Sequence, residues 1–269
     1  MGAFRDFKNT IRDLDKNLQS LFEQANTAIS EQQFDHAKIL LEHIKQQRPK
    51  DARWMHGLGN LHHYRGESTL AYHYYMQAAQ LKFALAFDHL GQIESERHNH
   101  LLAEHYFLSA IQHGHSKSLV ALGKILLNQY RIEDALGCFY QALEHEYNEV
   151  FIPLAQCYLL QKQYDLAKDA LTKALDLDLP HASHYIAQMY QQQRRFDDAK
   201  SWYLHAFQTE KNIASLEQFG QILCAQGQLI QGEKIIQLAQ KIEFTDELSQ
   251  NDQQLMQTIL GNNSSFHIT

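Results

Sequence analysis

Cysteine, proline and glycine are all scarce in this sequence of 269 residues, which contains 3, 3 and 12 of them respectively. The cysteines, Cys138, Cys157 and Cys224, are far apart and give neither a disulfide framework nor the ligand spacing of a zinc site. No run of about 18 apolar residues is present, which argues against a membrane-spanning helix. The N-terminus lacks the apolar core of a secretory signal. We therefore expect a soluble cytoplasmic protein, with export as the alternative if a signal once preceded Met1.

An excess of positive charge is also missing. The chain has 24 Lys and Arg against 31 Asp and Glu, a formal net charge of -7. Because nucleic-acid binding depends on a basic face, we do not expect a nucleic-acid partner. Catalytic signatures are missing too, since the sequence has no Gly-x-Ser-x-Gly, no P-loop and no dinucleotide-binding glycine pattern. We expect neither enzymatic activity nor a cofactor.

What the sequence does contain is one pattern repeated seven times. A small residue is followed by a second small residue twelve positions later, a bulky one four later and a small one three later, as in Gly59, Ala71, Tyr75 and Ala78. The second positions, separated by 34, 32, 32, 32, 32 and 33 residues, are Ala37, Ala71, Ala103, Ala135, Ala167, Ala199 and Gly232. Apolar residues recur at helical spacing around these positions, and no strand-like alternation is long enough to predict a sheet. The pattern predicts an all-α array of helix pairs.

The repeat resembles the tetratricopeptide repeat, a helix-turn-helix of about 34 residues. The residues of two copies that carry the resemblance are Met55, Leu58, Gly59, Ala71, Tyr75 and Ala78, then Phe151, Leu154, Ala155, Tyr158, Ala167, Leu171 and Ala174. Ala71–Ala79 and Ser201–Tyr203 are also similar to Sel1-like repeats. The resemblance covers about residues 21–240 and implies a right-handed α-solenoid of about seven repeats, with helical caps at both ends. The expected divisions are residues 1–20, 21–240 and 241–269.

The two ends of the chain read as helices that close the array. Apolar residues spaced 3, 4, 3, 4 and 3 apart form one stripe, namely Phe4, Phe7, Ile11, Leu14, Leu18 and Leu21. Residues 1–20 then form either a solvating cap or a dimerisation helix, because such a stripe is also a short coiled-coil seam. Binding to a membrane surface is a third reading. Residues 241–269 are expected to hold a closing helix and a mobile tail.

Histidine is the one unusually abundant residue, with 17 copies. His181 and His184 are three apart and share a helix face, as do His56 and His63, which are seven apart. There is no His-Glu-x-x-His and no zinc spacing. We expect histidines that are solvated or lie at interfaces, and keep a histidine-dependent metal-binding protein as a less favoured alternative.

The resemblance also implies where a partner would bind. Family members contact ligands from the first helix of each repeat, near six and three positions before the small residue and one and four after it. On this sequence the selected positions are Arg53, His56, Asn60, His63, Asp88, Gln92, Lys117, Lys124, Gln156, His184 and Gln188. The family's clamp for a C-terminal carboxylate is incomplete here, because His56 replaces the expected Lys and Ala121 the expected Arg.

We therefore predict a non-enzymatic scaffold or adaptor that binds a protein or peptide in its concave groove. Within that class, an assembly or regulatory factor of a larger bacterial machine is suggested by many repeats with no appended domain. Binding through an edge or a cap, with a solvated groove, stays open. The main alternative is a structural homodimer assembled through the N-terminal helix.

Overall fold

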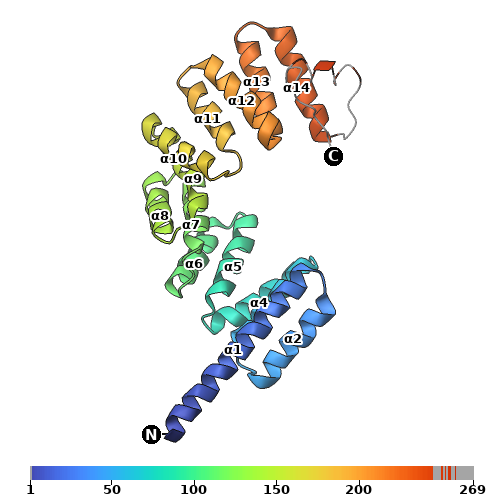
Figure 1. Cartoon of the computed structure of the whole chain (residues 1–269), viewed down its shortest axis with the longest axis vertical. Helices are drawn as coiled ribbons and strands as arrows, with labels where there is room; N and C mark the ends of the chain where they lie inside the picture. Colours follow the sequence, from blue (N-terminus) through green and yellow to red (C-terminus); the bar gives the residue numbers. More distant parts are fainter. Residues whose placement is uncertain (1, 245–249, 251, 253, 256–257, 259–269) are drawn as a thin grey trace. The chain divides into compact units, whose positions relative to one another are not determined.

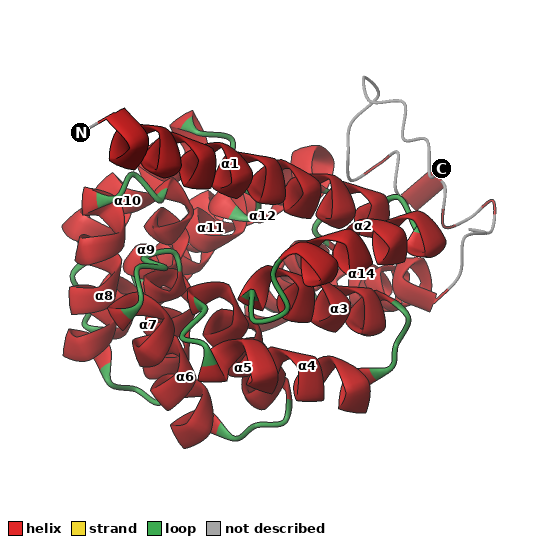
Figure 2. Ribbon diagram, turned by 90° about the horizontal axis from the view of Figure 1, so that it is seen from below, coloured by secondary structure: helices red, strands yellow, loops and turns green. Residues whose placement is uncertain are grey.

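The computed structural model describes residues 2–244 together with residues 250, 252, 254, 255 and 258, and it describes the side chains of residues 12–242 and of those five later residues. These residues form helices joined by short loops, and no strand occurs among them (Figures 1 and 2). The helices are α1 Gly2–Ser30, α2 Phe34–Gln47, α3 Ala52–Tyr64, α4 Ser68–Gln80, α5 Ala84–Glu96, α6 His100–Gln112, α7 Ser118–Asn128, α8 Ile132–Glu144, α9 Phe151–Leu160, α10 Tyr164–Asp176, α11 Ala182–Gln192, α12 Phe196–Glu210, α13 Ile213–Ala225 and α14 Leu229–Phe244, with a short 3-10 helix at Asn148–Val150.

The helices pack as pairs in two compact units. In the first unit, Met1–His145, α1 packs on α2, α3 on α4, α5 on α6 and α7 on α8. In the second, Glu146–Thr269, the pairs are α9 with α10, α11 with α12 and α13 with α14. Within each unit the second helix of one pair also packs on the first helix of the next. The predicted all-α array of helix pairs is confirmed. No helix of the described residues is both long and apolar enough to span a bilayer.

Glycine or alanine at the first small position lets the two helices of a pair approach closely. A Cβ placed on Gly59 would lie 2.5 Å from the Tyr75 ring, and one on Gly91 would lie 2.7 Å from the Phe107 ring. Both rings are buried. Two of the pairs with alanine at this position carry leucine instead of an aromatic residue opposite it, as in Ala155 with Leu171. The volumes are matched in these copies, whereas in the sixth copy Ala187 lies opposite the fully buried Tyr203.

The turn inside each pair ends the first helix with a residue in the left-handed conformation. Its φ is between 57° and 85° in all seven pairs, at Gln32, Gly66, His98, Tyr130, Lys162, Arg194 and Gly227. Glycine is favoured there because it has no Cβ to clash with the following carbonyl. Only two of the seven positions use it, so five turns carry backbone strain.

Replacing Tyr130 with glycine is expected to stabilise the protein by about 0.5–1 kcal/mol, the left-handed penalty less the added chain entropy of glycine. Tyr130 is 78% exposed, so little packing is lost. The control is Tyr140→Gly in the middle of α8, which should destabilise by about 1 kcal/mol. Urea denaturation measures both changes, and destabilisation by Tyr130→Gly would contradict the account of the turn.

The N-terminal helix is longer than any other helix described. α1 has 29 residues and α2 has 14, so α1 is about 44 Å long and α2 about 21 Å. The boundary predicted between residues 20 and 21 falls inside α1. Leu18 and Phe22 are buried against Leu41 and Trp54, so this part of the helix belongs to the first repeat. Leu14 and Leu21 pack around the same cluster, whereas the side chains of Phe4, Phe7 and Ile11 lie outside the described part of the chain. Most of the predicted C-terminal cap and tail lies outside it too.

Candidate partner-binding surface

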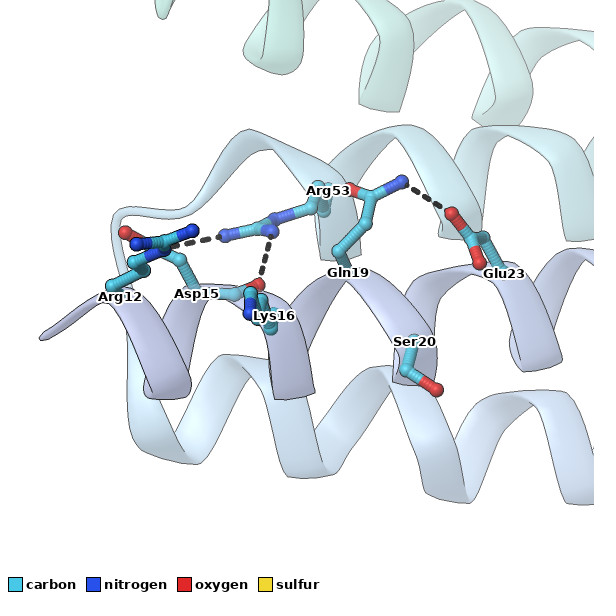
Figure 3. Close-up of a pocket in the computed structure, with 7 residues that line it drawn as sticks. All are labelled: Arg12, Asp15, Lys16, Gln19, Ser20, Glu23 and Arg53. Atoms are coloured by element: carbon cyan, nitrogen blue, oxygen red, sulfur yellow. Dashed lines mark hydrogen bonds and ion pairs between the residues drawn. The ribbon is translucent and has the colours of Figure 1, made fainter. Parts of the chain in front are cut away.

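A hollow of about 770 Å³ lies on the first helices of the first two repeats (Figure 3). Six of its lining residues come from α1 and one from α3, namely Arg12, Asp15, Lys16, Gln19, Ser20, Glu23 and Arg53. Arg53 is one of the predicted binding residues. The other lining residues were not predicted: the family positions were carried over from the second copy onward, and on the first copy they would have added only Gln19.

Ion pairs hold Arg53 in place. Its Nη2 lies 2.7 Å from Asp51 Oδ2 and 3.7 Å from Asp15 Oδ1, and its Nη1 donates to the Asp15 carbonyl at 3.4 Å. Asp51 also accepts from the Arg53 backbone N–H at the start of α3. Burial raises the pKa of Asp51, but the bonds to Arg53 outweigh it and hold this pKa below its ordinary value. Arg53 therefore bonds chiefly to Asp51 at the start of its own helix, and its contacts with Asp15 of α1 are longer.

Four other cationic side chains, on the first helices of this unit or at their ends, are free of ion pairs with described residues. Arg12, Lys16, Lys117 and Lys124 are exposed, and none forms an ion pair with a residue that the structure describes. Lys117 and Lys124 are seven residues apart, at the N-cap of α7 and two turns into it, so they share one face of that helix. His63 and Gln92 are exposed as well.

Of three other predicted positions, His56 and Asp88 are buried and Asn60 is half-buried, and each bonds to the neighbouring repeat. His56 is 2% exposed, and its Nε2 lies 3.1 Å from His89 Nδ1. Asn60 donates to Asn26 Oδ1 at 3.0 Å. Asp88 is 8% exposed and accepts from the Ser118 hydroxyl. Side chains that reach from one first helix to the next therefore make these positions points of contact between repeats.

The predicted residues of the second unit behave in the same way. His184 is buried, with Nδ1 2.7 Å from the Ser215 hydroxyl and Nε2 2.9 Å from the Gln188 amide. Ser215 is fully buried, so this serine–histidine contact offers no nucleophile to a substrate. Gln156 donates to the Tyr185 hydroxyl and is half-buried.

Sequence reasoning missed the partners of these buried groups, His89, Ser118 and Ser215. A signal for the serines was present, because Ser118 and Ser215 both lie five residues before the small residue of their own repeat. Each bonds to the repeat that precedes it, at Asp88 and at His184. No comparable signal singled out His89.

An amide side chain follows the first small residue in six of the seven copies. The six are Asn26, Asn60, Gln92, Gln156, Gln188 and Gln221, and Lys124 is the exception. The amino groups of Gln92 and Gln221 donate to Asp88 and Glu217 of their own helices, at 2.7 and 3.3 Å. Their carbonyl oxygens take no part in any hydrogen bond among the described residues. Each of these glutamines therefore offers a ligand its carbonyl oxygen as an acceptor, together with the second hydrogen of its amino group as a donor.

Comparison with known proteins agrees with this architecture. Residues 150–181, which cover the pair α9 and α10, match the family described as tetratricopeptide repeat. The fold is that of the tetratricopeptide-repeat proteins. No curated protein sequence matches the chain. The predicted recognition of tetratricopeptide repeats is confirmed, whereas the Sel1-like character stays a prediction.

Solved tetratricopeptide-like structures share the fold at low sequence identity. A Pseudomonas aeruginosa pilF structure is 16% identical with a TM-score of 0.64, covering 76% of this chain and 97% of its own. PilW, a type IV pilus biogenesis factor, is 15% identical with a TM-score of 0.61, covering 77% and 98%. A tetratricopeptide repeat protein from Parabacteroides merdae is 15% identical with a TM-score of 0.64, covering 91% and 100%.

Histidine clusters do not form a metal centre in the described part of the chain. No group of three or more His, Cys, Asp or Glu side chains there is placed to hold a metal ion. In the pair predicted to share a helix face, His181 is exposed and His184 is buried. The described residues therefore offer no site of this kind for the metal-binding alternative.

Proposed function

We propose that this protein is a non-enzymatic scaffold that binds a protein or peptide partner on the face formed by the first helices of its repeats. The observation that carries the proposal is that all four cations Arg12, Lys16, Lys117 and Lys124, on the first helices of the first unit or at their ends, are exposed and form no ion pair with a described residue. Elsewhere in that unit Arg48, Arg97 and Arg131 are paired with acids, whereas Lys38, Lys50 and Lys82 are exposed and form no ion pair with a described residue. Proteins of this fold present such faces to extended partners.

The proposed partner is an acidic segment in an extended conformation. Its carboxylates would pair with Lys117 and Lys124, while its backbone N–H groups would donate to amide oxygens such as that of Gln92. Each exposed ion pair contributes only about 0–1 kcal/mol. Affinity would therefore accumulate over several repeats, and binding would weaken as salt concentration rises.

The test is affinity purification from the native host with identification of bound proteins by mass spectrometry. The wild type is compared with Lys117→Glu/Lys124→Glu and with the control Lys38→Glu/Lys82→Glu, which makes the same charge change at exposed positions on α2 and on the turn after α4. A partner that binds the wild type and the control but not the first variant supports the proposal. A partner retained by all three proteins would overturn the assignment of binding to the face formed by the first helices. Loss of the partner from both variants would show that binding depends only on the net charge of the protein, which would also overturn it.

We further propose that the partner belongs to a larger bacterial assembly that this protein helps to build, and that it works in the cytoplasm. Support for the assembly role is the likeness in fold to PilW, described as a type IV pilus biogenesis factor. Support for the compartment is that Cys138, Cys157 and Cys224 form no disulfide. Identification of the bound proteins tests the first point, and fractionation of the host cell tests the second.

A second candidate is a structural homodimer formed through α1. The observation that favours it is the length of α1, about twice that of α2, together with the apolar stripe that runs from Phe4 to Leu21. Deletion of residues 1–11 tests it, because the deletion stops short of the buried Leu18. A dimer that becomes a monomer in light scattering supports this role, and a monomeric wild type excludes it.

A further inference from the structure

Two histidines from consecutive first helices meet inside the first unit. His56 on α3 and His89 on α5 are joined by a 3.1 Å contact between His56 Nε2 and His89 Nδ1. His56 is enclosed by rings from three other segments, with centroid distances of 5.7 Å to Phe22, 5.1 Å to Phe83 and 5.5 Å to Tyr75. His89 stacks on Tyr75 at 4.8 Å. The pair therefore lies at the joint between the second and third repeats.

The contacts of His89 Nδ1 are best satisfied when His56 is neutral. His89 Nδ1 lies 2.9 Å from the Leu85 carbonyl oxygen, which can only accept, so this nitrogen carries a proton. His56 Nε2 faces the same N–H and must be the unprotonated acceptor. The proton of neutral His56 is then on Nδ1, which is buried and has no hydrogen-bond partner among the described residues. A second proton on His56 would have to go to Nε2, where it would face the His89 N–H.

The ionisable groups around the pair offer little to stabilise a cation. His115, before α7, disfavours the charged form of both rings, and His63 on α3 disfavours that of His89. Asp88 on α5 is the one carboxylate that favours charge on His89, but it already accepts from Gln92 and Ser118. Tyr75 is the ionisable group from α4, and the contact from α1 is Phe22. Burial is the main reason that the pKa values of His56 and His89 are lowered.

We propose that the His56–His89 pair is a proton-sensitive joint, at which uptake of a proton breaks the contact between α3 and α5 and loosens the packing of the second repeat on the third. A histidine whose folded pKa is lowered contributes full stability above its unfolded value, about 6.5, and loses it as the pH falls below that value. The joint is therefore closed at neutral pH and weakened by mild acid. This role does not depend on the proposed partner.

The experiment compares urea unfolding of the full chain at pH 7 and pH 5.5. Each such histidine raises the unfolding constant by up to about tenfold per pH unit. We therefore expect this pH change to raise the wild-type constant about tenfold more than that of His56→Phe, which keeps an aromatic ring in the site. The control His105→Phe replaces an exposed histidine on α6 and should retain the wild-type pH dependence. Equal pH dependence of the wild type and His56→Phe would overturn the proposal.

A measurement on the wild type alone covers the case in which His56→Phe does not fold. Nitrogen NMR of the imidazoles should show His56 protonated on Nδ1 at pH 7 and titrating below its ordinary pKa. Amide exchange in α3 and α5, corrected for its intrinsic pH dependence, should accelerate at pH 5.5 relative to α7 and α8. A His56 that titrates with an ordinary pKa, or is protonated on Nε2 at pH 7, would contradict the joint.

Discussion

Replacing Gly123 with alanine is expected to destabilise the first unit by about 1–3 kcal/mol, the usual cost of overpacking a core. A Cβ at this position would lie 2.8 Å from Phe139 Cδ1 and closer still to Cε1 of the same ring. Phe139 is fully buried, so its ring has no room to move away. The helices α7 and α8 would have to separate instead. Urea denaturation followed by helical circular dichroism measures the change.

The chain itself supplies a control and a rescue for this prediction. Gly137, on α8, has no atom within 4 Å of its added Cβ, so Gly137→Ala should stabilise by about 0.5–1 kcal/mol through helix propensity alone. Adding Phe139→Leu to Gly123→Ala recreates the combination found at Ala155 and Leu171 and should recover part of the loss. A double variant less stable than Gly123→Ala would show that the volumes at these positions are not matched.

Replacing Asp88 with alanine is expected to cost about 2–3 kcal/mol, although the family resemblance places this residue at a ligand-contact position. Its carboxylate accepts from Ser118, which is 1% exposed, and from Gln92. Hydrogen bonds to a charged group contribute about 1.5–3 kcal/mol, and the buried hydroxyl would lose its acceptor. The loss should appear in the isolated protein, with no partner present.

The matched control is Gln92→Ala, one turn further along α5. Gln92 is exposed, and its removal leaves the bond between Ser118 and Asp88 in place, so stability should change by no more than about 0.5 kcal/mol. If Asp88 served only to contact a partner, both variants would be equally stable. Denaturant unfolding of the two proteins decides between these roles.

The repeat architecture could be predicted from the sequence because its packing rule recurs residue by residue. The two helices of one repeat approach each other closely at small residues such as Gly59 and Gly91. Each of these glycines lies sixteen positions before an aromatic residue. That contact is local in sequence, and its period shows directly. The seven left-handed turn residues follow the same period, from Gln32 to Gly227, although only two of them are glycine. Composition alone gave no sign of the other five.

Which residues of the candidate site are buried depends on contacts between neighbouring repeats. The sequence pattern of a single repeat does not show these contacts. Helical spacing correctly placed Arg53, His56 and Asn60 on one face of α3, but it could not show that the preceding and following helices cover part of that face. His56, Asp88 and His184 are about one repeat away from the groups that they bond.

By itself, then, the sequence determined the helix pairs, their number and the small and bulky positions that meet inside each pair. Tertiary structure alone decided which polar residues are buried between repeats and which, like Lys117 and Lys124, remain exposed to solvent. The physical reason is that periodicity reports the direction of a side chain from its own helix. Burial depends instead on how closely the next helix approaches.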